Sequence, residues 1–224
     1  MHSEEQTLAL REQFDTAAQQ KDASTLGMWI FLITEVMFFG GMFLAYSIYR
    51  AKFPEVFAIA STSLNVKIGA ANTLVLICSS FTMVMAVRAS QLGKLRDIVW
   101  WLVATLILGF TFLAVKAFEW NEKFELHHVP GMANFHLNGV GASMQGPASI
   151  FFSLYFAMTG LHALHMVVGV GILTWLIIET KRGKFSAVYM TPVDIAGLYW
   201  HFVDIVWIFL FPLLYLIDRH LNIQ

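Results

Sequence analysis

Several apolar stretches of this chain contain ionisable side chains, which are costly to place in hydrocarbon. The run YWHFVDIVWIFLF contains His201 and Asp204, three residues apart, in a segment long enough to cross a bilayer. A second apolar stretch contains His162 and His165, and Glu35 interrupts the run TEVMFFGGMF. An ionisable group in hydrocarbon costs roughly 2.5–3.5 kcal/mol on insertion scales, so one that is retained there marks function or pairing. We therefore interpret these groups as functional or partnered side chains.

Helical geometry sorts these groups further. His162 and His165 would share one helix face, and so would His201 and Asp204. Counted along each helix at about 1.5 Å per residue, all of these groups and Glu35 can fall in one middle layer of a membrane. For the histidines, hydrogen-bonded core groups that fix helix register are an equally good interpretation. Glu35 favours a functional role, because a carboxylate among phenylalanines has little structural benefit.

A metal centre is the less favoured interpretation of the histidines. HALH, residues 162–165, is the one spaced pair, whereas iron- or zinc-dependent membrane desaturases and hydroxylases need several His-rich clusters. Haem ligation by histidines of two helices is possible in principle. His127, His128 and His136 form a second tract, but no Cys and no tight ligand spacing accompany them. We therefore expect no metal site in this chain.

Long apolar segments must position these side chains. Of the 224 residues, 58% are hydrophobic and 13% are charged, and the mean hydropathy is +0.65. Hydrocarbon leaves backbone N–H and C=O groups no partners outside their own segment, so a single span must be helical. The sequence predicts the all-α fold class, as an integral membrane bundle of five transmembrane helices. The expected spans are 25–49, 68–89, 98–119, 148–178 and 195–217.

The first 24 residues differ in composition from the rest. They are rich in charged residues and contain no basic stretch that leads into an apolar core, so we expect no signal peptide. We expect a polar N-terminal cytoplasmic segment (1–24) followed by one transmembrane domain (25–224). The net charge of −1 argues against nucleic-acid binding. A single cysteine, Cys78, allows no intrachain disulfide.

The placement of Lys and Arg predicts the orientation. Compact basic clusters at 88–96 and 181–184 follow the second and fourth spans, and such clusters favour the cytoplasmic side. The N-terminus would then be cytoplasmic and the C-terminus periplasmic. Near the outer end of the third span, Lys116 and Glu119 have the i,i+3 spacing of an ion pair.

Five motifs, in this order, resemble subunit III of the haem–copper terminal oxidases, the cytochrome c oxidase subunit III family. They read TEVMFFGGMFLAY, NTLVLICSS, LGFTFLAVKAFEW, FFSLYFAMTGLHALHMVVG and YWHFVDIVWIFLF. The similarity covers about residues 27–218. Many members have seven helices, and the expected five resemble the short bacterial forms.

The resemblance implies roles for single residues and no catalytic residue. Glu35 matches the family's carbodiimide-reactive carboxylate, a candidate for proton uptake. Lys116 replaces a Gln of the family and would form its pair with Glu119 at the outer surface. The other implied site residues are an intramembrane polar network (His162, His165, Tyr199, His201, Asp204) and candidate lipid contacts (Arg182, Trp200, Trp207).

The resemblance also implies a function. The chain would be a non-catalytic core subunit of a proton-translocating enzyme complex, in the aerobic respiratory chain of a bacterial cytoplasmic membrane. Haem and copper would lie in partner subunits I and II, with no cofactor in this chain except bound phospholipid. The chain would pack on subunit I, beside subunit II and a small subunit IV or a larger supercomplex, and would support proton uptake and active-site durability.

Alternatives concern the electron donor and the class of protein. Cytochrome c is favoured because Glu35 matches that branch, whereas quinol-oxidase forms often carry Asp. Subunit III of a quinol oxidase, or a homologue associated with nitric-oxide reductases, remains open. From another class, a structural or assembly membrane protein with no oxidase partner also remains open.

Overall fold

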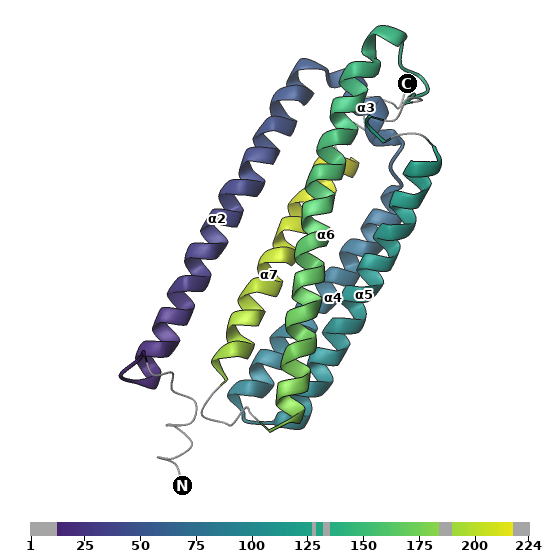
Figure 1. The fold of residues 1–224 in the computed structure, drawn as a ribbon. Helices are drawn as coiled ribbons and strands as arrows, with labels where there is room; N and C mark the ends of the chain where they lie inside the picture. Colours follow the sequence, from purple (N-terminus) through teal and green to yellow (C-terminus); the bar gives the residue numbers. More distant parts are fainter. Residues whose placement is uncertain (1–12, 127–128, 132–134, 184–189, 217–224) are drawn as a thin grey trace. The chain divides into compact units, whose positions relative to one another are not determined.

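The computed structural model describes residues 13–126, 129–131, 135–183 and 190–216 (Figure 1). Within these ranges every regular element is helical, which confirms the predicted all-α fold class. Five helical stretches are long and apolar enough to cross a membrane, as predicted. The elements are α2 (Ala17–Lys52), α3 (Pro54–Thr62), α4 (Val66–Gln91), α5 (Leu95–Glu125), η1 (Ala142–Met144), α6 (Gln145–Lys181), α7 (Thr191–Phe211) and η2 (Pro212–Leu216).

Most of the spanning helices are longer than their apolar segments. α2 begins at Ala17 rather than at Thr25, and α5 continues past Glu119 to Glu125. Polar side chains support the extra turns: Asn121 Nδ2 donates to Glu125 Oε1 at 2.9 Å, one turn along α5. Hydropathy marks only the residues suited to hydrocarbon, so it underestimates helices that project into water.

A short helix that hydropathy did not reveal, α3, links α2 to α4. It begins with Pro54. Proline is tolerated in the first turn because the N–H groups there have no acceptor within the helix. The next helix, α4, is capped by Asn65, whose Oδ1 accepts from the backbone N–H of Lys67 at 3.1 Å and of Ile68 at 3.3 Å. Turn and cap residues therefore define this connection.

The helices contribute to two compact units, both of which contain candidate site residues. We call these unit 1 and unit 2. Unit 1 comprises residues 1–36, 76–110 and 166–204, and unit 2 comprises residues 37–75, 111–165 and 205–224.

One indole lies at the centre of unit 1. Trp200 of α7 is fully buried, with Gly109 of α5 and Gly169 of α6 against its ring. A Cβ atom at Gly109 would lie 2.8 Å from Trp200 Cη2, and one at Gly169 would lie 2.9 Å from Cζ3. Neither position has room for a larger side chain, so the two glycines fix how α5 and α6 approach α7.

Unit 2 has an aromatic core. Phe57 of α3 packs edge-to-face against Phe151 of α6, with ring centroids 5.3 Å apart. After α7 the chain widens into the single π turn η2, which begins at Pro212, a residue with no N–H to donate. Tyr46 of α2 donates to the Leu213 carbonyl at 2.9 Å within this turn. The π turn leaves Tyr215 buried in the unit.

Candidate functional site

In unit 1, two adjacent serines of α4 contact two adjacent residues of α7. Trp200 Nε1 donates to Ser79 Oγ at 3.2 Å, and His201 Nδ1 lies 2.8 Å from Ser80 Oγ. The serines end the motif NTLVLICSS, and their partners lie in YWHF. These contacts join two of the motifs across helices.

Asp204, one turn after His201, is the most deeply buried acid of unit 1 among the candidates, at 3% exposure. Ser80 lies within interaction range of its carboxyl group. Even so, the described part of the chain supplies neither carboxyl oxygen with a hydrogen bond of good geometry. Asp204 is therefore a buried acid whose hydrogen-bonding capacity is unused by the described residues, which is rare in protein interiors.

Glu35 lies half-buried on α2 in unit 1, beside Tyr199 of α7. The two groups interact electrostatically, and Phe31, one turn earlier, stacks on the Tyr199 ring with centroids 6.1 Å apart. Tyr199 also lines a groove of about 280 Å³ between α2, α6 and α7, where Ser24 and Thr191 contribute hydroxyl-bearing side chains. The polar neighbour of Glu35, Tyr199, thus also lines this groove of unit 1.

Unit 2 contains a buried polar cluster, which we call the Lys116 cluster: Lys116, Glu119, Tyr155 and Tyr215. Lys116 Nζ lies 3.1 Å from Glu119 Oε2, 2.8 Å from the Tyr215 hydroxyl and 3.4 Å from the Tyr155 hydroxyl. Both tyrosines donate to Glu119 Oε1, Tyr155 at 2.8 Å. The ammonium also lies 4.8 Å from the ring centroid of Trp207.

The expected ion pair is therefore present, and its place near the outer surface of the membrane stays a prediction. Lys116 and Glu119 are each only 3% exposed, so the pair lies inside unit 2 and not at the surface of the chain. Each donor of the cluster meets an acceptor, which is the condition for tolerating a buried charge pair. The tyrosines were missed because Tyr in an apolar span looks like core packing, although a buried Tyr hydroxyl usually needs a partner.

The two histidines of α6 also lie in unit 2, in different surroundings. His162 is fully buried between the rings of Phe112 and Trp207, with centroids 5.3 Å and 5.1 Å away. Neither of its ring nitrogens has a hydrogen-bond partner among the described residues. His165 is half-buried, packs on Phe39 and places Nδ1 2.9 Å from the Leu161 carbonyl oxygen. That these histidines share one membrane layer with Glu35, His201 and Asp204 stays a prediction.

The lipid candidates are not alike. Trp200 and Trp207 are buried, and their indole N–H groups donate to Ser79 and to Thr73, the latter at 3.0 Å. Both side chains therefore pack inside the chain, and the lipid contact expected of them stays a prediction. Arg182 is exposed and lies 3.1 Å from Glu179 Oε1, and its contact with a lipid head group stays a prediction.

A second buried lysine was not anticipated. Lys123 of α5 donates to the backbone carbonyl of Ser63 at 2.6 Å, at the end of α3, and its side chain is buried. Among the described residues no group of three or more His, Cys, Asp and Glu is arranged to hold a metal ion. His127 and His128 of the loop tract lie outside the described residues, whereas His136 lies within them.

All of these helices fall within one family alignment. The family model for cytochrome c oxidase subunit III matches residues 10–218 of the 224. The chain belongs to this family. The resemblance drawn from the five motifs is thereby confirmed, and the protein is a multi-pass membrane subunit III of the haem–copper oxidases.

Individual subunit III proteins show the same similarity over most of their length. A probable cytochrome c oxidase subunit 3 of Nocardia farcinica is 34% identical over 193 residues, which are 86% of this chain and 87% of that protein. The cytochrome c oxidase subunit 3 of Thermostichus vulcanus is 31% identical over 206 residues, 92% of each chain. The quinol oxidase subunit 3 of Bacillus subtilis is 30% identical over 191 residues, 85% of each chain. Membership implies association with other oxidase subunits.

Proposed function

We propose that this subunit III is a non-catalytic core subunit of a cytochrome c-oxidising complex in a bacterial cytoplasmic membrane. Haem and copper reside in subunits I and II, and this chain packs on subunit I, in contact range of subunit II and of a small subunit IV or a larger respiratory assembly. It supports proton uptake and the durability of the active site. The observation that carries the proposal is Glu35, set in TEVMFFGGMFLAY and beside Tyr199, in a chain of this family.

Packing on another membrane subunit is supported by the exposure of α2. Within the most apolar window of this helix only 11% of the residues are buried in the chain. Trp29, Met37 and Phe38 are among its large exposed side chains. Lipid tails are as apolar as these side chains, so association depends on close packing with neighbouring helices. A multi-helix partner such as subunit I offers that packing.

A role of Glu35 in proton uptake is supported by its surroundings in unit 1. The groove that Tyr199 lines has hydroxyl-bearing side chains at Ser24 and Thr191, and hydroxyls can hold ordered water. A proton that reaches Tyr199 is within electrostatic reach of Glu35. In this proposal Glu35 exchanges protons with that groove and subunit I performs oxygen reduction.

Cytochrome c is the proposed electron donor, and quinol is the second candidate. Relatives named cytochrome c oxidase subunit 3 and one named quinol oxidase subunit 3 have similar identities, 30% to 34%. Glu35, rather than Asp, favours the cytochrome c branch. Family membership disfavours a structural protein that lacks oxidase partners.

We further propose that the N-terminal segment 1–24 is cytoplasmic, that the C-terminus is periplasmic, and that Arg182 contacts a phospholipid head group. The exposed guanidinium of Arg182 supports the lipid contact, since a guanidinium can bind a phosphate group in a planar, bidentate geometry.

The test is isolation of the complex through an affinity tag on this chain, in mild detergent. We expect haem-bearing subunit I and a copper-bearing subunit II to co-purify, and oxygen consumption to be driven by reduced cytochrome c rather than by quinol. Quinol-driven consumption alone would move the protein to the second candidate. Repeated isolation without a haem-bearing membrane subunit would refute the oxidase role.

A further inference from the structure

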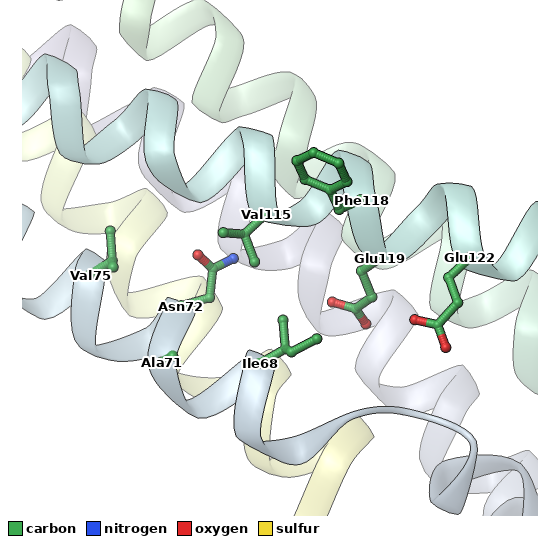
Figure 2. Close-up of a pocket in the computed structure, with 8 residues that line it drawn as sticks. All are labelled: Ile68, Ala71, Asn72, Val75, Val115, Phe118, Glu119 and Glu122. Atoms are coloured by element: carbon green, nitrogen blue, oxygen red, sulfur yellow. The ribbon is translucent and has the colours of Figure 1, made fainter.

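A groove between α4 and α5 in unit 2 ends at an exposed carboxylate (Figure 2). Its volume is about 370 Å³, and its wall is mainly apolar, with Ile68 and Val75 of α4 and Val115 of α5 among the lining residues. Glu122, the last lining residue of α5, points into the space between the two helices. The groove therefore combines an apolar length with an acidic end.

Glu122 is only weakly paired among the described residues. Its side chain is 53% exposed, and the ammonium of Lys123 lies 4.0 Å away. That ammonium is buried and donates to the Ser63 carbonyl at 2.6 Å. The other acid that lines the groove, Glu119, is buried and paired with Lys116. No lysine or arginine of the described ranges lines the groove, so the Glu122 carboxylate can accept a cation from outside the chain.

An exposed aromatic ring lies next to this carboxylate on α5. Phe118 precedes Glu122 by four residues, so the two side chains are neighbours on one helix face. Phe118 also lines the groove and is 79% exposed. A guanidinium suits this pair, because it binds a carboxylate in bidentate geometry and stacks on aromatic faces. A lysine ammonium is a compact point charge and lacks this planar match.

Small side chains next to the groove leave room for another helix. Ala71 of α4 lines the groove and is exposed, and Ala114 of α5, one turn before Phe118, is exposed as well. Lipid tails are as apolar as the side chains of a span, so helix association in a bilayer depends on close packing, which small residues permit. The carboxylate, the ring and the two alanines together favour a helix as the partner of this face.

The position along α5 places the carboxylate at the membrane surface. α5 has 31 residues, about 46 Å of helix, against a hydrocarbon core of about 30 Å. Glu122 lies three residues before the end of the helix, about 5 Å along the axis, so it falls in the head-group layer. Val115 lies about 10 Å deeper in the same groove. An arginine near the end of a partner helix can bury its methylene stem along this wall and keep its charged head at the surface.

We propose that this groove is the docking site for a transmembrane helix of another subunit, which inserts an arginine side chain. The guanidinium binds Glu122 and stacks on Phe118, and the partner helix packs over Ala71 and Ala114. A charge pair of this kind selects the partner and fixes its register more than it adds affinity. The inference rests on association with other subunits, which family membership implies, and not on the proposed electron donor or the role of Glu35.

The experiment is photo-cross-linking in the complex isolated through a tag on this chain. A benzophenone amino acid, which keeps an aromatic ring, replaces Phe118, and mass spectrometry identifies what it captures. We expect a peptide from a membrane span of another subunit, with an arginine close to the captured residue. The same probe in place of Phe124, which packs on Phe156 and does not line the groove, should not capture that peptide. Capture of lipid alone at position 118, of a span without arginine, or of the same peptide at both positions would overturn the proposal.

Matched variants test the carboxylate. Glu122→Gln removes the charge from an exposed side chain, and the loss of one charge-assisted hydrogen bond corresponds to about a tenfold change in binding. We expect the cross-link yield with the partner subunit, measured after dilution in detergent, to fall about tenfold. Glu125→Gln changes a neighbouring exposed acid that does not line the groove and should leave the yield unchanged. An unchanged yield in Glu122→Gln, or an equal loss in both variants, would overturn the proposal.

A charge exchange identifies the partner residue. Glu122→Arg should abolish capture of the partner span, and replacing the arginine of that span by glutamate in the same complex should restore it. Failure to restore capture would overturn the proposal. Haem content and oxidation of cytochrome c are measured on the same wild-type preparation. Their absence would refute the proposed function, whereas the cross-links alone decide the docking site.

Discussion

At the scale of single residues, the Lys116 cluster shows how a charge is kept inside a membrane helix. The ammonium of Lys116 has three oxygen neighbours and an aromatic face, and the carboxylate of Glu119 has three donors. Removing one member of a buried ion pair leaves the other uncompensated, which costs about 3–5 kcal/mol, although the intact pair itself adds little net stability. The pair therefore matters mainly because losing one partner would leave the other as an uncompensated buried charge.

Lys116→Met should accordingly lower the free energy of unfolding by about 3–5 kcal/mol. The double variant Lys116→Met/Glu119→Gln should lose less, because the amide oxygen still accepts from the two tyrosines and no buried charge remains. Thermal unfolding of the purified chain in detergent measures both. A double variant as unstable as the single variant would contradict the account.

Glu35 carries the residue-scale prediction about function. A hydrophobic carbodiimide partitions into apolar surroundings, so it should label Glu35 ahead of Asp194, near the start of α7, as mass spectrometry of the digested chain will determine. Asp218, the other acid used for comparison, lies outside the described residues. Glu35→Gln should preserve assembly and oxygen reduction, and should change proton uptake, proton pumping or the number of turnovers before inactivation.

Two results would refute this view of Glu35. A substituted complex that assembles with its haems but cannot reduce oxygen would contradict the non-catalytic assignment. Labelling elsewhere, together with unchanged proton uptake, pumping and durability, would reduce Glu35 to a group that sets helix register.

At the scale of elements, glycines decide how closely α6 and α5 approach α7 in unit 1. A Cβ at Gly169 would lie 2.9 Å from the Trp200 ring, whereas a Cβ at Gly171, on the same helix, would meet nothing within 4 Å. An alanine at each of these positions changes helix propensity in the same way, but only the one at Gly169 would clash with Trp200. Comparing the two variants thus separates the effect of packing from that of helix propensity.

Gly169→Ala should destabilise the protein by about 1–3 kcal/mol, the usual cost of overpacking. Gly171→Ala should be neutral or stabilising by about 0.5–1 kcal/mol, since alanine favours a helix interior. Thermal unfolding of the two variants side by side is the measurement. Equal effects in the two variants would show that the Trp200 contact does not limit the approach of α6.

The elements themselves were largely predictable, and their pairing was not. Apolar length predicted the five spans because hydrocarbon imposes it, but it gave no sign of α3, which begins at Pro54 and is followed by the Asn65 cap of α4. Helix spacing predicted that Lys116 and Glu119 would meet. It could not predict the partners Tyr155 and Tyr215, because these depend on how each helix is rotated against the others. The same limit applies to Trp200 and Trp207, whose hydrogen bonds to Ser79 and Thr73 could not be predicted from apolar spacing.

At the scale of the whole molecule, the distribution of positive charge predicts the orientation in the membrane. Lys94 lies in the turn between α4 and α5, Arg96 lies in the first turn of α5, and a second basic cluster begins at Lys181, the last residue of α6. Basic residues favour the cytoplasmic side, so this turn should be cytoplasmic.

Cysteine labelling tests that orientation, since Cys78 is the single native cysteine. In a Cys78→Ser background, Leu92→Cys in the α4–α5 turn should react with a membrane-impermeant maleimide only in inside-out vesicles. Asn121→Cys, near the end of α5, should react in right-side-out vesicles. The reverse pattern would invert the proposed topology.

The double contact between α4 and α7 has a consequence for how the gene can change. Ser79 and Ser80 bind Trp200 and His201, two neighbours to two neighbours. A replacement on one helix leaves a polar atom on the other helix without its hydrogen-bond partner. A shift of one helix by one residue along the other would break both contacts at once. These four positions should therefore change together or not at all during evolution. An alignment of related proteins should show correlated substitutions at them.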